Sequence, residues 1–251
     1  MNAVSVAHPF TLEGSTVLVV GASSGIGAAT SQMASSLGAK VLLSSRSRAA
    51  LDDVREQLPD PSRAAVLPMD YLEPDSIRAA LANVRNIDHV LISAVADENK
   101  KRGPFLELED QTMHASFDKF WGQVNVARAV VPRMTSNGSL TMLSSVAGLA
   151  PSGAESGLSV MNGVQAAVIQ TGKSLARELA PLRVNIIAPG VVLTNVWSTE
   201  ERERLSAWMQ EDLPVARTGQ PEHVAAAAIS FMVNPYITGT VLPVDGGLLL
   251  S

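Results

Sequence analysis

The sequence predicts a single α/β domain built on a doubly wound parallel sheet. Short apolar runs rich in Val, Leu and Ile alternate along the 251 residues with longer stretches of helical character. This alternation is typical of parallel strands joined by crossover helices. The apolar runs contain few alternating polar residues, as expected for strands that are covered by helices on both faces.

Seven strands and five long helices are expected from this pattern. The strands are expected at Val17–Val20, Lys40–Ser44, Ala65–Pro68, His89–Ile92, Ser139–Ser144, Arg183–Ala188 and Val241–Val244. The helices are expected at Gly25–Leu37, Arg48–Leu58, Pro74–Val84, around Phe117–Thr135 and at Asn162–Leu179. Joined by right-handed crossovers, these elements give one Rossmann-type domain over residues 1–251.

The composition is that of an ordinary globular protein. Hydrophobic residues make up 46% and charged residues 17% of the chain, and the net charge is −5. An acidic balance argues against a nucleic-acid surface, which needs a basic stripe. We expect neither a membrane span nor a secretory leader, because no apolar run has the required length and context. The absence of cysteine excludes disulfides and thiolate sites and is compatible with the cytoplasm, where we expect the protein.

A glycine-rich segment at Gly21–Gly27 has the spacing of a dinucleotide-binding loop. Gly21, Gly25 and Gly27 fall where a strand turns into a helix, and a side chain there would block the approach of a pyrophosphate. The N-terminus of the helix adds free N–H donors and partial positive charge for the phosphates. The alternative is that these glycines serve only tight packing.

The residues after the second expected strand discriminate between the two nicotinamide dinucleotides. Enzymes that prefer NAD place a carboxylate there for the ribose 2′-hydroxyl, whereas this chain has Ser44-Ser45-Arg46. Arg46 can offer a planar pair of charged donors to a 2′-phosphate, with help from Ser45 or Arg48. The sequence therefore predicts NADP(H); the alternative is that Arg46 is a solvated turn residue.

Four further landmarks follow the glycine-rich segment in order. They are Asp70, Pro189-Gly190 with Thr194, Ile237-Thr238-Gly239 and Val244-Asp245-Gly246-Gly247. With the glycine-rich segment, they resemble the short-chain dehydrogenase/reductase family over about residues 11–248. The resemblance implies a Rossmann-type fold, a nicotinamide cofactor, a small-molecule substrate and assembly as a homo-oligomer, a tetramer or dimer. The apolar segments Phe231-Met232-Val233 and Leu248-Leu249-Leu250 would suit such an interface.

The resemblance also implies roles for single residues around the cofactor. Asp70 would hold the adenine amino group, helped by the backbone near Tyr71. Ser93 and Ala94 stand below the adenine ribose, where the family has Asn-Asn-Ala-Gly. Thr194 would bind the carboxamide or the phosphates. The predicted cofactor contacts are Gly21, Ser23, Ser24, Gly25, Ile26, Gly27, Ser45, Arg46, Asp70, Tyr71, Ser93, Ala94, Gln165, Pro189, Gly190, Val192 and Thr194.

The family's Tyr-x-x-x-Lys pair is missing from this chain. Counting back from Ser174-Leu175-Ala176 places Met161 on the tyrosine and Gln165 on the lysine. Neither side chain can give up a proton at neutral pH. The two tyrosines of the chain, Tyr71 and Tyr236, lie in other segments and do not fill the gap.

Two other residues are the candidate catalytic groups. Ser145 matches the family's serine, which polarises the carbonyl, and Ser144 is the alternative if the register differs. Lys119 falls on the family's asparagine. A lysine that is partly desolvated beside a cofactor can act as a proton donor, so we hypothesise that Lys119 replaces the tyrosine. The alternative is a surface lysine paired with Asp118.

Three residues are candidate substrate contacts. They are Met161, Glu155 in the preceding loop, and Trp197 in residues 194–218, which form the substrate lid in the family. Trp197 and Trp208 could instead pack a lid helix, and Glu155 could simply be solvated. The four histidines lack metal-ligand spacing, so no metal is expected.

The sequence therefore favours an NADP(H)-dependent oxidoreductase with a non-standard active site. Its substrate would be a small carbonyl compound, a quinone or an enone, because hydride delivery needs only the nicotinamide in position. The alternatives are a dinucleotide-binding sensor or partner subunit without catalysis, and an isomerase or cyclase without net redox chemistry.

Overall fold

The computed structural model describes residues 10–95, 103–151 and 157–250. These residues form one parallel sheet with the strand order β3-β2-β1-β4-β5-β6-β7, which confirms the predicted doubly wound sheet. The strands are β1 (Thr16–Val20), β2 (Lys40–Ser45), β3 (Ala64–Pro68), β4 (Ile87–Ile92), β5 (Met134–Leu143), β6 (Arg183–Pro189) and β7 (Val241–Val244).

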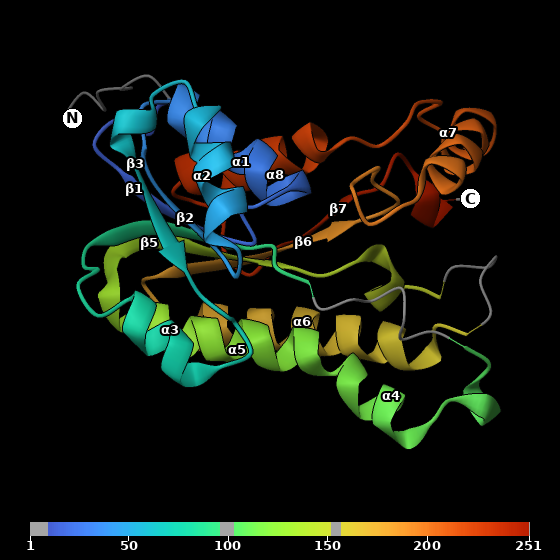
Figure 1. Ribbon diagram of the computed structural model, residues 1–251. Helices are drawn as coiled ribbons and strands as arrows, with labels where there is room; N and C mark the ends of the chain where they lie inside the picture. The colour runs from blue at the N-terminus through green and yellow to red at the C-terminus, as the bar shows by residue number, and fades with distance from the viewer. Residues whose placement is uncertain (1–9, 96–102, 152–156, 251) are drawn as a thin grey trace, which may run out of the picture.

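Helices cover both faces of the sheet (Figure 1). One face carries α1 (Gly25–Ser36), α2 (Arg48–Glu56) and α8 (Pro221–Val233), and the other carries α3 (Pro74–Ala80), α5 (Asp118–Val130) and α6 (Ser159–Glu178). Two further helices, α4 (Asp110–Ser116) and α7 (Thr199–Asp212), lie towards the carboxyl ends of the strands. Short 3₁₀ turns occur at η1 (Pro61–Arg63), η3 (Phe105–Glu107), η4 (Val131–Arg133), η5 (Val146–Gly148) and η6 (Leu248–Leu250).

Each face of the sheet has its own hydrophobic core. Val17 and Val19 of β1 pack on the side of α1 and α8, whereas Leu18 and Val20 pack on the side of α3 and α5. Successive side chains of a strand point to opposite faces, so a strand buried on both faces needs apolar residues at every position. This requirement explains the unbroken apolar runs of the sequence.

Two parts of the fold differ from the expectation. Helix α8 was not predicted, and it buries Phe231 and Met232 to 1% and 3% exposure in the core shared with α1. These two side chains are therefore not available to a subunit interface, and that part of the expected interface is wrong. Strand β5 begins at Met134, before the predicted Ser139, because Met134 also pairs with Ile87 across an irregularity in the ladder.

Arg183, at the start of β6, holds the end of α8. Its guanidinium donates to the carbonyls of Phe231 at 2.6 Å, Met232 at 3.2 Å and Ile237 at 3.2 Å. The last carbonyls of a helix have no partner within the helix, and a cation is favourable beside them. Arg183 thereby joins the start of a strand to the segment between α8 and β7.

His89 is buried in the row of side chains that crosses β4, β5 and β6. Its Nδ1 lies 2.9 Å from the Ser139 hydroxyl, and Ser139 is paired with Arg183 on the next strand. The pKa of His89 is lowered to about 4, chiefly by burial and also by the positive charge of Arg183, while Asp88 opposes the shift. His89 is therefore neutral in the folded protein at neutral pH.

The described residues also include no helix with the length and apolar character needed to span a membrane.

We predict that His89 makes the fold sensitive to acid. Because the folded pKa lies below the ordinary value of 6.5, the unfolded chain takes up the proton more readily as the pH falls towards 4. Stability contributed by neutral His89 is thus fully present above about pH 6.5 and falls by about 2 kcal/mol between about pH 7.5 and pH 5. Denaturant unfolding at both pH values measures this loss.

The control is His89→Gln, which cannot take up a proton in this range. Its free energy of unfolding should fall less over the same interval, since only the other titrating groups then contribute. An equal fall in both proteins would contradict the assignment.

Candidate active site

The glycine-rich loop is pressed against the loop that follows β4. A methyl group on Gly21 would lie 2.5 Å from the Ala94 nitrogen, and one on Gly27 would overlap the Gly21 carbonyl oxygen. The amide and the hydroxyl of Ser93 both donate to the Val20 carbonyl, at 2.8 and 3.0 Å. The structure therefore brings together the predicted residues Gly21, Gly27, Ser93 and Ala94.

Helix α1 begins at this loop without a side-chain cap. Ser24 is its N-cap residue and makes no capping hydrogen bond from its side chain. Gly21 and Gly25 have φ values of +96° and +53°, which only glycine adopts easily. The first N–H groups of a helix point out from its end and suit an anion. Ser23 and Ile26, the other predicted contacts, lie in this same turn.

Arg46 and Asp70 meet in an open depression at the ends of β2 and β3. Its volume is about 300 Å³, and it is lined by Arg46, Pro68, Met69, Asp70 and Ser76. One oxygen of the Asp70 carboxylate accepts the Leu72 amide at 3.0 Å. The hydroxyls of Ser44 and Ser45, which precede Arg46 in the chain, are buried, and neither has a hydrogen-bond partner among the described residues. Buried polar atoms of this kind need an explanation, and a ligand is one.

Tyr71 lies inside the protein rather than in this depression. It is 7% exposed and belongs to the core on the α3–α5 face. Its ring packs against Gly122 of α5, where a methyl group would overlap it. A contact between this residue and an adenine would therefore have to come from the Tyr71 backbone.

The predicted nicotinamide contacts follow the end of β6. The Gly190 amide donates to the Val244 carbonyl at 3.0 Å, and Pro189 is buried at the end of the strand. Val192 is 8% exposed. Thr194 lies over the glycine-rich loop, because a methyl group on Gly25 would be 3.1 Å from Thr194 Cγ2. The segments after β1 and β6 are thus in contact.

The corner that follows β5 is held by hydrogen bonds from three neighbouring elements. The Ser144 amide donates to the Ile187 carbonyl of β6 at 2.9 Å, and its hydroxyl donates to the Gln165 carbonyl of α6 at 2.8 Å. From α5, Gln123 Nε2 donates to the Leu143 carbonyl at 2.8 Å. Ser145 caps η5 by accepting the Ala147 amide at 3.3 Å, so its own hydroxyl proton can point elsewhere. The two serines therefore differ: Ser144 is buried in the fold and Ser145 is part-buried at the turn.

The residues at the positions of the missing pair are buried. Met161 and Gln165 are 5% and 3% exposed. The Gln165 side-chain oxygen lies 3.4 Å from the Ser144 hydroxyl. Lys119 is only 3% exposed, so its expected alternative position on the surface is wrong, whereas its pairing with Asp118 stays a prediction. The role of Lys119 as a proton donor stays a prediction.

Residues 194–218, the predicted lid, contain α7 and lie towards the carboxyl ends of the strands. Arg202 of α7 donates to the Thr194 carbonyl at 2.7 Å and to the Trp197 carbonyl at 3.1 Å. The Trp197 indole N–H donates to the Val192 carbonyl at 3.0 Å, which fixes the ring against the start of the lid. Met209 is fully buried. Glu155, the remaining predicted substrate contact, lies outside the described residues.

Gln123 is a residue of this site that sequence analysis missed. It is fully buried, yet an amide side chain in a helix ordinarily indicates a solvated face. Its position four residues after Lys119, on the same side of α5, was the available signal. Within the described residues, no cluster of acidic or histidine side chains could hold a metal ion.

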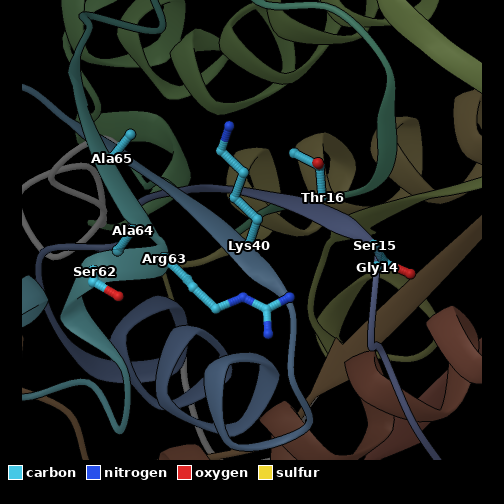
Figure 2. A pocket seen from close by; sticks show the side chains of 8 residues that line it. All are labelled: Gly14, Ser15, Thr16, Lys40, Ser62, Arg63, Ala64 and Ala65. Carbon is cyan, nitrogen blue, oxygen red and sulfur yellow. The ribbon is translucent and has the colours of Figure 1, made fainter.

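A larger cavity lies at the amino ends of the strands, away from these residues (Figure 2). It has a volume of about 580 Å³ and is lined by Gly14, Ser15, Thr16, Lys40, Ser62, Arg63, Ala64 and Ala65. Arg63 is paired with Glu13 at 3.0 Å, and the Lys40 side chain extends in another direction (Figure 2). Because ligands of such sheets bind at the carboxyl ends, we assign no part of the site to this cavity.

Known proteins resemble this chain over almost its whole length. Residues 21–249 match the family model described as Enoyl-(Acyl carrier protein) reductase. Galactitol 2-dehydrogenase (L-tagatose-forming) of Cereibacter sphaeroides is 32% identical over 250 residues, which cover 95% of this chain and 96% of the relative. L-xylulose reductase of Mus musculus is 29% identical, with 96% and 98% covered. The crystal structure of a small-chain dehydrogenase in complex with NADPH is 28% identical, has a TM-score of 0.77, and covers 94% of this chain and 99% of its own.

Proposed function

The chain belongs to the short-chain dehydrogenase/reductase family, and from this membership we propose that it is an NADP(H)-dependent oxidoreductase with a non-standard proton donor. The observation that carries the proposal is the arrangement at the ends of β1 and β2. There an uncapped helix N-terminus lies behind a glycine loop that excludes side chains, and Arg46 lines an open depression at the ends of β2 and β3. A relative of known structure was crystallised with NADPH, which agrees with this choice of cofactor.

The residues present fit a phosphorylated dinucleotide. The N–H groups of α1 would hold the pyrophosphate, and Arg46 with Ser45 would hold the 2′-phosphate. Asp70 would accept from the adenine. A carboxylate among the residues at the end of β2 would repel the 2′-phosphate, and Ser44, Ser45 and Ser47 supply none there.

The proposed chemistry needs little from the protein beyond a proton and a hydrogen bond. When NADPH is bound, it supplies a hydride. Ser145 donates its hydroxyl proton in a hydrogen bond to the substrate oxygen and so polarises the C=O bond. As that oxygen gains the electron pair of the bond, the Lys119 ammonium gives it a proton, directly or through water. Solvent then returns a proton to the amine.

An apolar, conjugated carbonyl compound fits this site best. Met161 provides no acid, so a substrate whose reduced oxygen is stabilised by conjugation, such as a quinone or enone, is favoured. Exposed apolar side chains also stand on loops at the carboxyl ends of strands: Val95 is 40%, Leu149 42% and Val196 52% exposed. They would cover an apolar substrate at its entrance.

The two alternative functions predict different behaviour towards NADPH. A sensor or partner subunit would bind NADPH without turnover, and an isomerase or cyclase would convert substrate without consuming NADPH. Arg202 donates hydrogen bonds to the Thr194 and Trp197 carbonyls and so fixes the start of the predicted lid. A fixed lid favours an enzyme that encloses a substrate. A cytoplasmic location stays a prediction.

Assembly as a homotetramer or dimer is part of the proposal. Phe117 and Trp121 at the start of α5 are 38% and 57% exposed, and Phe120 stacks edge-on against both, with ring centroids 6.5 and 5.1 Å apart. Exposed aromatic clusters of this kind mark protein interfaces.

The first prediction of the proposed function concerns the cofactor. Arg46→Ala should weaken NADPH binding about 10- to 100-fold, because a charged hydrogen bond contributes roughly 1.5–3 kcal/mol, and should leave NADH binding unchanged. Calorimetric titration with both dinucleotides measures this. Arg63→Ala is the matched control, since it removes the same charge at the opposite edge of the sheet. Equal NADPH affinity in all three proteins would sink the assignment of Arg46.

The second prediction concerns the proton donor. Lys119→Met should lower kcat about 10²- to 10⁴-fold, the usual effect of removing a general acid, while NADPH binding is unchanged. Steady-state rates with quinones, enones and ketones measure it. Full activity in the variant would exclude Lys119, and NADPH binding without turnover in the wild type would favour the sensor.

The third prediction concerns assembly. Trp121→Glu places a charge in the exposed aromatic cluster and should shift the protein from a tetramer or dimer to a smaller species. Light scattering coupled to gel filtration measures the mass, with Tyr236→Glu as a control at another exposed aromatic residue. A monomeric wild type would refute the proposed assembly.

A further inference from the structure

We propose that Gln123 is a positioning residue, which fixes the distance between Lys119 and Ser145. This inference rests on the proposed function, because it assumes that those two residues act on one substrate oxygen. Gln123 itself is fully buried, and it would act through the backbone that carries Ser145.

The contact that carries the proposal joins α5 to the end of β5. Gln123 Nε2 donates to the Leu143 carbonyl at 2.8 Å, with both residues buried. Leu143 is the last residue of β5, two residues before Ser145. A hydrogen bond to that carbonyl therefore sets where the turn begins.

The same helix carries Lys119. Lys119 and Gln123 are four residues apart on α5 and both are buried, so they project from the same side of the helix. Hydrogen bonds from Ser144 hold the corner to β6 and α6. Gln123 adds a hydrogen bond from α5. It thereby couples the helix that carries Lys119 to the end of β5, which leads into Ser145.

The other half of the Gln123 amide supports a role beyond stability. Its Oε1 atom is buried and has no hydrogen-bond partner among the described residues. An unsatisfied buried acceptor is unfavourable and offsets much of what the Nε2 bond contributes. Gln123 therefore contributes little net stability, but its Nε2 donor fixes the backbone two residues before Ser145. This combination indicates that Gln123 serves to position that backbone.

The test is a double-mutant cycle measured as kcat with a quinone or enone that the wild type reduces. Gln123→Met should lower kcat about 10- to 100-fold, because small misplacements of reacting groups have effects of that size. The Kd for NADPH and the KM should change less than about twofold. In a Lys119→Met background the same substitution should lower kcat less than about threefold, since the distance it disturbs no longer matters.

Each outcome bears on the proposal. Gln170→Met, an exposed glutamine of α6, is the matched control and should leave kcat unchanged. Equal kcat in Gln123→Met and wild type, or an equal loss in both backgrounds, overturns the positioning role alone. A wild type without turnover overturns the proposed function as well. If Gln123→Met does not fold, Gln123→Leu replaces it, and failure of both to fold assigns Gln123 to the fold and overturns the proposal.

Discussion

The parallel pairing of β1 with both β2 and β4 is the constraint on which the site depends. The chain leaves β1 towards β2 on one side and comes back to it as β4 on the other. The loops after β1 and β4 must therefore pass each other at the same edge, where Gly21 has no room for a side chain against Ala94. Packing of the two loops thus requires glycine at position 21, in addition to any approach of a phosphate.

Most of the fold was predictable because the sheet is buried on both faces. Such strands need continuous apolar runs, and these runs located six of the seven strands to within two residues at each end, whereas β5 begins five residues earlier than predicted. Helix α8 escaped prediction for a related reason. Its segment carries four successive alanines at 225–228, and its exposed polar residues Glu222 and His223 stand only in the first turn, so it shows little helical period. It packs beside α1 on the same face of the sheet.

The sequence predicted those parts of the candidate site whose residues stand at fixed places relative to the strands. The glycine spacing and the residues after each strand indicated the cofactor edge, and the structure brings several of them together. Burial, by contrast, is a property of the packed structure. Lys119 and Gln123 carry polar side chains on a helix, and the sequence does not distinguish a solvated helix face from one that is pressed against β5 and α6.

The Arg183 guanidinium, at the start of β6, influences which parts of the protein unfold together. Arg183 donates to the carbonyls of Phe231, Met232 and Ile237. Asn185 also donates to the Ile237 carbonyl and accepts the Thr240 amide. The end of α8, the loop beyond it and the start of β7 therefore share their anchors. Cooperative units of folding often coincide with such connected elements. The end of α8, the loop beyond it and the start of β7 should therefore open together, and their opening is coupled to a residue at the amino end of β6.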